Sequence, residues 1–158
     1  MHAYVAVVGA GEASADEQRE AEQVGRGLAQ AGAVVVCGGL GGVMEAACRG
    51  AKSAGGTTVG ILPGTARDAA NPFVDIAVAT GLGEMRNALV VRSADALIAV
   101  GGEFGTLSEI ALALKAGKPV VGLGTWQLAR GDKPIDAIVR AASADEAVRR
   151  VLAACSLP

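Results

Sequence analysis

Aromatic residues, histidine and an excess of one charge are what this sequence has least of. Aromatics make up 3% of the 158 residues, and 14 lysines and arginines nearly balance 16 acidic residues, for a net charge of −2. A protein that binds nucleic acid normally presents a basic surface, or aromatic rings on which bases stack. The single histidine, His2, lies at the N-terminus, which excludes a Ser-His-Asp triad, a Cys-His pair and a multi-histidine metal site. The composition therefore predicts neither nucleic-acid binding nor histidine-based catalysis.

Cysteine and long apolar runs are also scarce. Cys37, Cys48 and Cys155 are an odd number at unrelated spacings, which indicates buried, reduced thiols in a cytoplasmic protein. The longest stretch without a polar or charged side chain, 31–44, is broken by glycines and is shorter than the roughly 20 residues that a membrane helix needs. The N-terminus lacks the basic segment of a signal peptide. We therefore expect a cytoplasmic protein with no membrane partner.

Short apolar runs alternate along the chain with amphipathic segments, and glycines separate them. Apolar, β-branched runs such as 4–9 (YVAVVG) are typical of strands that are buried on both faces. Such runs predict strands at 4–9, 33–37, 57–62, 74–79, 95–100, 119–123 and near 137–140. Helical spacing predicts helices from the capping box Ser14–Glu17 to Ala31, and at 43–54, 82–93, 106–116 and 144–155, the last capped by Ser143–Glu146. The stretches 63–73 and 124–136 are expected to be loops.

Strand, helix and strand in this order predict an α/β protein with a Rossmann-like, doubly wound parallel sheet. With no repeat or linker in the sequence, we expect a single three-layer domain over residues 1–158. In such a sheet, ligands bind beyond the carboxyl ends of the strands, where the strand order reverses. The loops 9–14, 38–43, 80–86 and 101–106 should lie near that edge.

The first of these loops only partly matches a dinucleotide-binding fingerprint. Gly9 and Gly11 fit the pattern, but Ser14 stands where the third glycine belongs. The second strand also ends in Cys37-Gly38-Gly39, with no acidic residue to hold a ribose hydroxyl. The sequence therefore disfavours an NAD-dependent dehydrogenase, and a tight strand-to-helix turn explains the same glycines.

Two more glycine-rich loops open helices, and together with the first they predict a phosphate-binding edge. Free N–H groups and a positive dipole end make a helix N-terminus suitable for phosphate, and glycine lets the backbone approach it. The residues predicted to bind the ligand in these loops are Gly9, Gly11, Ser14, Gly38, Gly39, Gly41, Gly42, Gly101, Gly102, Gly105 and Thr106. We expect a small phosphorylated ligand, with a nucleotide first among the possibilities.

Glu109 and Arg86 each allow two interpretations. Thr106–Glu109 has the spacing of a capping box, and Arg86 fits a solvated surface charge or an ion pair. Near the ligand edge, however, a carboxylate beside a guanidinium is sufficient to cleave an N-glycosidic bond, with the carboxylate stabilising the sugar cation or activating water. Cys37 lacks a histidine base and is interpreted as a packed thiol, whereas Trp126 fits either a pocket wall or a subunit contact.

The stretch 84–109 resembles the signature region of the LOG ("Lonely Guy") proteins. Arg86, the strand Ala94-Asp95-Ala96 and the loop residues Gly102, Gly105, Thr106 and Glu109 carry the resemblance, which extends over roughly residues 3–123. An earlier segment with Gly38, Gly39, Gly41 and Met44 is similar as well, which adds Met44 to the predicted ligand residues. The resemblance implies a Rossmann-like homodimer or homotetramer that hydrolyses nucleoside 5′-monophosphates to free base and ribose 5-phosphate. Arg86 and Glu109 would then be the catalytic residues.

Departures from the family pattern point to a second function. Gly101 stands where the family has proline, Glu103 where it has a glycine, and Asn87 where it usually has lysine. These features resemble a short bacterial branch that is similar to the molybdenum-cofactor carrier proteins, which bind a phosphorylated pterin without turning it over. The alternative prediction is therefore a non-catalytic carrier. No resident cofactor or metal is expected, and no lysine lies in the predicted site loops, so the lysine decarboxylase label given to many LOG proteins has no Schiff-base residue.

Overall fold

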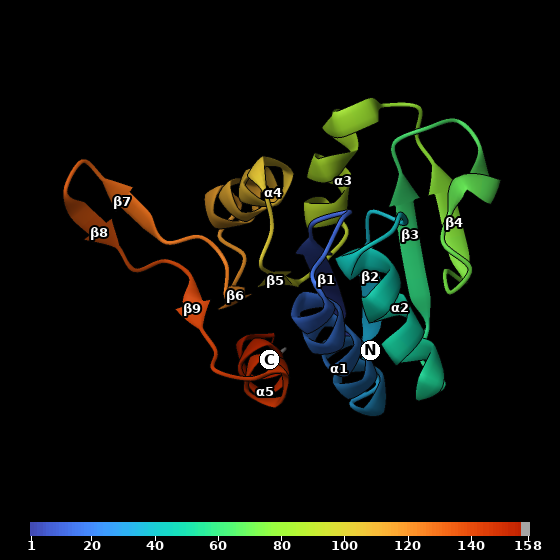
Figure 1. Ribbon diagram of the computed structural model, residues 1–158, viewed down its shortest axis with the longest axis horizontal. Helices are drawn as coiled ribbons and strands as arrows, with labels where there is room; N and C mark the ends of the chain where they lie inside the picture. The colour runs from blue at the N-terminus through green and yellow to red at the C-terminus, as the bar shows by residue number, and fades with distance from the viewer. Residues whose placement is uncertain (156–158) are drawn as a thin grey trace.

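Seven parallel strands form the central sheet of the protein, for which a computed structural model describes residues 1–155. The strands lie in the order β4-β3-β2-β1-β5-β6-β9. Their bounds are β1 Tyr4–Gly9, β2 Val34–Cys37, β3 Thr58–Leu62, β4 Ile76–Ala79, β5 Ala96–Val100, β6 Val120–Leu123 and β9 Val139–Arg140. The chain runs outward from β1 to β4 and then returns to β5 beside β1 (Figure 1). The predicted Rossmann-like α/β domain is therefore confirmed.

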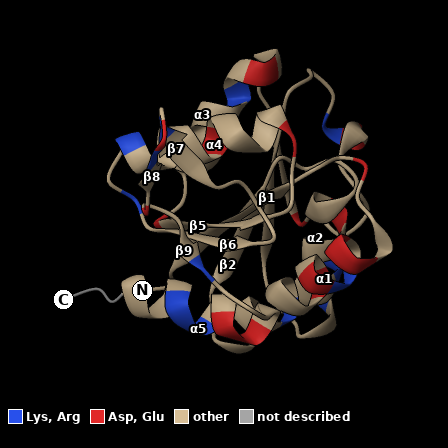
Figure 2. Ribbon diagram, turned by 60° about the vertical axis from the view of Figure 1, so that its left-hand side comes forward, with Lys and Arg blue, Asp and Glu red and all other residues tan. Residues whose placement is uncertain are grey.

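Helices cover both faces of this sheet. They are α1 Ala15–Gln30, α2 Val43–Ser53, α3 Arg86–Arg92, α4 Phe104–Lys115 and α5 Ala144–Ala154, with short 3-10 turns η1 Arg67–Ala69 and η2 Gly83–Met85. Because side chains alternate along a strand, Val5 and Val7 of β1 face one helical layer, while Ala6 and Val8 face the other. Charged residues lie on the helices and loops around the apolar central strands (Figure 2). Among residues 1–155, no helix combines the length and apolar character needed to span a bilayer.

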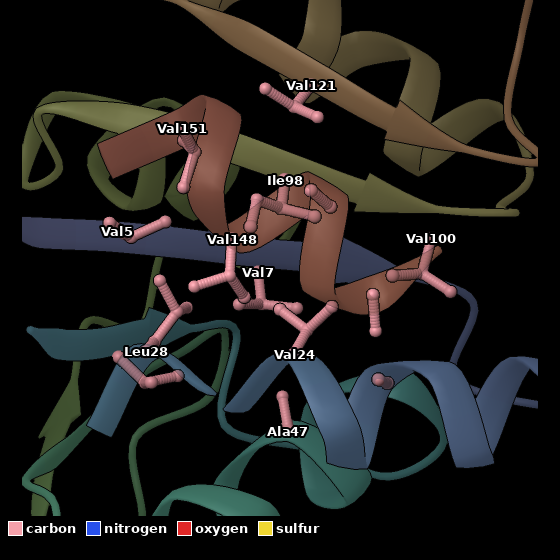
Figure 3. Packing of buried hydrophobic residues seen from close by; sticks show 14 of the residues in the cluster. Val5, Val7, Val24, Leu28, Ala47, Ile98, Val100, Val121, Val148 and Val151 are labelled. Atoms are coloured by element: carbon pink, nitrogen blue, oxygen red, sulfur yellow. The ribbon is translucent and has the colours of Figure 1, made fainter. Parts of the chain in front are cut away.

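The larger core lies between the sheet and the layer made by α1, α2 and α5. Figure 3 shows how side chains of α1 and α5 meet those of β1 and β5, and the residues labelled there are Val5, Val7, Val24, Leu28, Ala47, Ile98, Val100, Val121, Val148 and Val151. The buried residues of α1, α2 and α5 are all apolar. Small side chains allow α1 and α2 to pack closely, as the abundance of alanine and glycine predicts.

Several elements differ from the sequence predictions. The segment 124–136 is not wholly irregular, because β7 (Leu128–Arg130) and β8 (Lys133–Ile135) form an antiparallel hairpin. Its strands are three residues long and mostly exposed, so they show no apolar alternation. The expected helix 82–93 is divided into η2 and α3, and the edge strand begins at Ile76 rather than at residue 74.

The predicted helix caps are only partly present. Ser14 and Glu17 form the full capping box of α1, in which each side chain accepts a backbone N–H of the other. At α5, the Ser143 hydroxyl accepts the Glu146 N–H, but the Glu146 carboxylate accepts from Ala142 instead of Ser143. Cys155 follows α5 and is half-buried, so the prediction of a buried thiol is wrong for this residue.

Candidate functional site

The predicted ligand loops meet at one edge of the sheet. Loops 10–14, 38–42 and 101–103 follow β1, β2 and β5, which are neighbours in the sheet. The Val43 N–H donates to the Ala10 carbonyl at 3.1 Å, and this bond ties the start of α2 to the β1 loop. Since the strand order reverses between β1 and β5, this edge is the position where open α/β sheets bind ligands.

The four longest helices differ in how their N-termini are satisfied. Ser14 caps α1 and Ser143 caps α5. The N-cap residues of α2 and α4, Gly42 and Glu103, make no side-chain cap bond. The first-turn N–H groups of α4, and those of α2 other than the Val43 N–H that is bonded to Ala10, therefore remain available to an anion, and both helices begin at the ligand edge.

The helix α4 begins two residues earlier than predicted, and this corrects the interpretation of Thr106 and Glu109. Because the helix begins at Phe104, Thr106 lies inside its first turn, buried with its hydroxyl near Gly102. Gly102 has φ +102°, and a Cβ there would collide with the Thr106 side chain. The predicted capping box Thr106–Glu109 is not formed, so Glu109 is not explained by helix capping.

Arg86 is buried and hydrogen-bonded within the protein, so it is not the solvated surface charge that the sequence also allowed. Its side chain is 9% exposed at the start of α3. The Nε atom donates to the Ile61 carbonyl at 2.9 Å, Nη2 donates to the Gly38 carbonyl at 3.3 Å, and Nη1 donates to the Asn87 side chain. A Cβ at Gly38 would stand 2.6 Å from Nη2 and 2.8 Å from the Met44 sulfur, so a larger residue here would have to displace the side chain of Arg86 or Met44. Arg86 therefore links the carboxyl ends of β2 and β3 to α3.

Glu109 is a buried carboxylate at the site, and its environment changes its protonation. It is 8% exposed on the inner face of α4, and no residue within 1–155 donates a hydrogen bond to its side chain. Burial raises the pKa of Glu109 to about 7, while the positive charge of Arg86 opposes the rise. The two side chains make no direct ion pair within the described part of the chain. A group that changes protonation near neutral pH suits either proton transfer or a pH-sensitive contact.

Two buried thiols lie under the 38–42 loop. The sulfurs of Cys37 and Cys48 are 3.5 Å apart, and the Gly39 N–H donates to Cys37 at 3.3 Å. The Cys48 hydrogen bond lowers the pKa of Cys37, with smaller help from Gly39 and Arg86, whereas the same contact and burial raise the pKa of Cys48. Both thiols pack with Met44 in a small apolar cluster, as predicted for packed thiols.

Two hollows open beside these groups. A groove of about 510 Å³ between α3 and α4 is lined by Glu84, Met85, Asn87, Ala88, Phe104, Gly105, Ser108 and Leu112. A second hollow of about 370 Å³ lies above the sheet edge and is lined by Ala10, Glu12, Glu17, Gly101, Gly102, Glu103, Gly124, Thr125 and Trp126. Its three carboxylates make this hollow a poor place for phosphate.

Trp126 lines the second hollow and packs against Phe104 of the groove, which favours the pocket-wall interpretation of this residue. Its ring is 5.5 Å from the Phe104 ring, and its N–H donates to the Glu103 carbonyl at 3.2 Å. Phe104, Asn87 and Ser108 were not predicted as site residues, although Asn87 donates to the Ser108 hydroxyl at 3.2 Å across the groove. Because the sequence has only one tryptophan and two phenylalanines, the rarity of these residues could have indicated Phe104 and Trp126 as candidate site residues. No sequence motif marked the Asn87–Ser108 contact.

The predicted ligand residues are thus divided among several places on one edge. Gly38, Met44 and Arg86 meet under the β2 loop, and Gly41 and Gly42 lie against the β1 loop near Gly11. Gly101 and Gly102 border the acidic hollow, while Gly105 borders the α3–α4 groove. Gly9 packs against Val43 at the end of β1, and Ser14 is occupied by capping. Within residues 1–155, no three or more histidine, cysteine or acidic side chains are grouped to hold a metal ion.

Solved structures resemble this protein over almost its whole length. The molybdenum cofactor binding protein of Rippkaea orientalis is 36% identical, covers 97% of both chains and superposes with a TM-score of 0.87. The molybdenum cofactor carrier protein of Chlamydomonas reinhardtii is 36% identical over 98% of this chain and 99% of its own, with a TM-score of 0.86. DNA processing protein A of Streptococcus pneumoniae, 21% identical with a TM-score of 0.72 over 96% of this chain and 61% of its own, shares the fold.

A sequence relative and a family model agree with these structures. A curated but uncharacterised protein of Archaeoglobus fulgidus is 53% identical over 119 residues, which are 75% of this chain and 78% of that protein. The predicted relationship to LOG-like Rossmann proteins is confirmed, because the matching model describes a SLOG family. Residues 2–150 match that model, and the chain belongs to the SLOG cluster4 family.

Proposed function

We propose that this protein binds and carries a phosphorylated small molecule, and that molybdenum cofactor is the first ligand to test. The observation that carries the proposal is the likeness, over nearly the full length of both chains, to proteins named as molybdenum cofactor binding and carrier proteins. The site supplies suitable chemistry in the uncapped N-terminus of α2 beside the Arg86 guanidinium. A carrier needs such a binding edge and no reacting group.

The phosphate is best placed at the start of α2. First-turn N–H groups and the helix dipole both favour an anion there. Arg86 has five N–H donors, of which three bond within the protein, so two remain for a phosphate oxygen. The start of α4 is less suitable, because the exposed Glu103 is its N-cap residue.

The acidic hollow suits the other end of such a ligand. A pterin carries an amino group and ring N–H groups, and carboxylates accept hydrogen bonds from such donors. Glu12, Glu17 and Glu103 supply carboxylates around the hollow, and Trp126 supplies a flat apolar wall. In this orientation the carboxylates face ring donors rather than the phosphate.

Gel filtration of the protein with molybdenum cofactor tests the carrier function. Molybdenum and pterin should elute together with the protein, while a phosphate-free pterin should elute separately because it lacks the group that binds α2 and Arg86. Metal analysis and pterin fluorescence of the protein fractions measure both. Elution of molybdenum and pterin apart from the protein would rule out this ligand.

A second candidate function is hydrolysis of a nucleoside 5′-monophosphate, and one observation favours it. Glu109 is a buried carboxylate to which no residue in the described part of the chain donates a hydrogen bond, and its pKa of about 7 suits a general acid or base at neutral pH. Chromatography of a nucleotide panel tests this function, with Glu109→Gln as the neutral variant of similar size. Free base from the wild type and none from the variant would favour the hydrolase, whereas intact nucleotides would favour the carrier.

Self-association belongs to the same proposal. The groove between α3 and α4 is lined by the exposed apolar side chains of Met85, Phe104 and Leu112, and Leu82 and Leu89 are also exposed. Such a patch favours the predicted homodimer or homotetramer. Light scattering should give a multiple of 15.6 kDa, and Met85→Lys should lower it. The predictions of a cytoplasmic location and of no nucleic-acid partner stay predictions.

A further inference from the structure

The carbonyl groups of the 38–42 loop are held by two side chains from distant parts of the chain. Arg86 Nη2 donates to the Gly38 carbonyl at 3.3 Å. Asn71 Nδ2 donates to the Leu40 carbonyl at 2.9 Å and to the Gly39 carbonyl at 3.4 Å, and the Asn71 backbone N–H donates to Gly39 at 2.9 Å. Three consecutive carbonyls of the loop are therefore bound on the side of Asn71 and Arg86.

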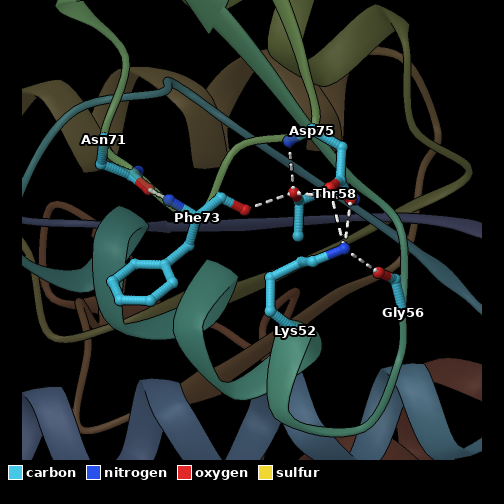
Figure 4. Close-up of polar contacts among 6 residues, drawn as sticks. All are labelled: Lys52, Gly56, Thr58, Asn71, Phe73 and Asp75. Carbon is cyan, nitrogen blue, oxygen red and sulfur yellow. Dashed lines mark hydrogen bonds and ion pairs between the residues drawn. The ribbon is translucent and has the colours of Figure 1, made fainter.

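Asn71 is itself fixed in place. Its side chain is 9% exposed, and its Oδ1 atom accepts the Phe73 N–H at 3.0 Å (Figure 4). Because Oδ1 faces a backbone donor, Nδ2 is the atom that faces the loop carbonyls. Its neighbours on the other side include the Cys48 thiol. The amide group therefore has one orientation, and both of its ends are used.

The bound carbonyls determine where the loop N–H groups point. All peptide bonds in residues 1–155 are trans, so each N–H points opposite to the carbonyl of the same peptide unit. With the carbonyls of Gly39 and Leu40 turned to Asn71, the N–H groups of Leu40 and Gly41 point away from it. No residue in the described chain accepts from the N–H groups of Leu40, Gly41 or Gly42. These donors adjoin the uncapped N-terminus of α2.

We propose that Asn71 is the positioning residue of the phosphate-binding loop. It does not touch the ligand; by holding the carbonyls of Gly39 and Leu40, it presents the opposite N–H groups to an anion. The inference rests on the proposed function, since it assigns the phosphate to the loop before α2. Neither a glycine-rich motif nor a local turn signal identifies Asn71, because its partners are 31 and 32 residues away in sequence.

Asn71→Asp is the variant that tests this role. The carboxylate keeps the acceptor for the Phe73 N–H, but it loses the donor and places an oxygen against two carbonyl oxygens. Asp75→Asn is the matched control. This reverse exchange alters bonds to Thr58 and Lys52 in the same segment and none to the 38–42 loop (Figure 4). Thermal unfolding of both variants shows how much stability each exchange removes.

Measurements of ligand affinity distinguish a specific effect on the 38–42 loop from a general loss of structure in the variant. We expect Asn71→Asp to bind molybdenum cofactor at least about tenfold more weakly than the wild type. The new carboxylate repels the carbonyl oxygens of Gly39 and Leu40, so the loop changes conformation and no longer presents its N–H groups to the phosphate. Its weak affinity for a phosphate-free pterin should not change, and Asp75→Asn should bind both probes like the wild type. Wild-type cofactor affinity in Asn71→Asp, or an equal loss for both probes, would overturn the proposal.

Amide hydrogen exchange tests the loop without any ligand. Exchange at residues 40–42 should be faster in Asn71→Asp than in the wild type and unchanged in Asp75→Asn. If the wild type binds no cofactor, the proposed function fails, and this measurement still decides whether Asn71 orders the loop. Unchanged exchange at 40–42 in Asn71→Asp would contradict the positioning role independently of the ligand.

Discussion

The two helical layers of this protein are built from different kinds of residue. The layer of α1, α2 and α5 buries hydrophobic side chains against the sheet in one continuous cluster. The layer of α3 and α4 buries hydrophobic residues too, but it also contains the buried polar residues Arg86, Asn87, Thr106 and Glu109. Both layers cover the same strands, so the sheet itself does not impose the difference.

The difference between the two layers indicates that one mainly stabilises the fold and the other is suited to binding. A buried polar or charged group is unfavourable unless the protein pairs it, whereas a buried aliphatic side chain stabilises the fold. Arg86 is paired with backbone carbonyls, but Glu109 has no hydrogen-bond donor among residues 1–155. Burying such a residue lowers the stability of the fold, and residues that lower stability in this way are expected at functional sites. The α3–α4 layer therefore has the character of a binding site, and the opposite layer that of a core.

The largest expected effect on stability lies in the apolar layer. Leu28→Ala leaves a cavity at a fully buried position of α1 and should lower the free energy of unfolding by about 4 kcal/mol. Ligand affinity of the folded protein should not change, because Leu28 is remote from the loops of the ligand edge. Urea unfolding and a binding titration measure the two quantities. The half-exposed Leu112→Ala, in the other layer, is the control and should lose far less.

Arg86→Met should affect both properties. It leaves the carbonyls of Gly38 and Ile61 without their donor and should lower stability by about 3 kcal/mol. It should also remove phosphate binding, as measured by cofactor retention in gel filtration. Arg92→Met, on the exposed end of the same helix, should change neither. Full cofactor retention by Arg86→Met would place the phosphate elsewhere.

Glu109 should make stability fall as pH rises. Its pKa is about 7 in the folded protein against an ordinary value of 4.5 for an exposed glutamate, so the folded state binds more protons between these values. The free energy of unfolding should therefore decrease by roughly 2–3 kcal/mol on this account from about pH 5 to pH 8. Arg86 and Cys37 are the ionisable groups that interact with it. Urea unfolding at several pH values should show this decrease in the wild type relative to Glu109→Gln; parallel curves would contradict it.

Most of the fold could be predicted from the sequence, because its signals are local. Apolar runs marked the parallel strands, glycines marked the turns, and Ser14–Glu17 marked the start of α1. The same local logic was wrong at Thr106–Glu109, where tertiary packing starts the helix at Phe104 and turns Glu109 inward. Thr106 and Glu109 have the spacing of a capping box, but the burial of both residues within α4 prevents it from forming.

The site was harder to predict because its contacts join distant segments. Arg86 bonds to carbonyls 25 and 48 residues away, and Asn71 to carbonyls 31 and 32 residues away. Hydropathy along the chain contains no information about such pairs. The resemblance to LOG proteins identified Arg86, whereas Asn71 lay in a segment predicted only as a loop. Loop positions therefore identified the edge, but not the side chains that shape it.

The smallest effect concerns the capped and uncapped helices. The Ser143 hydroxyl caps α5, so Ser143→Ala should lower the free energy of unfolding by about 1 kcal/mol and leave binding unchanged. Thr106 is buried in α4 but caps nothing, so Thr106→Val, similar in shape, should change stability by less than about 0.5 kcal/mol. Because the proposal places the phosphate at the start of α2, cofactor affinity of Thr106→Val should not change; a fall would place the phosphate at the start of α4 instead. Urea unfolding and cofactor titration of both variants decide the matter, because equal losses of stability would mean that Thr106 supports its helix as Ser143 does.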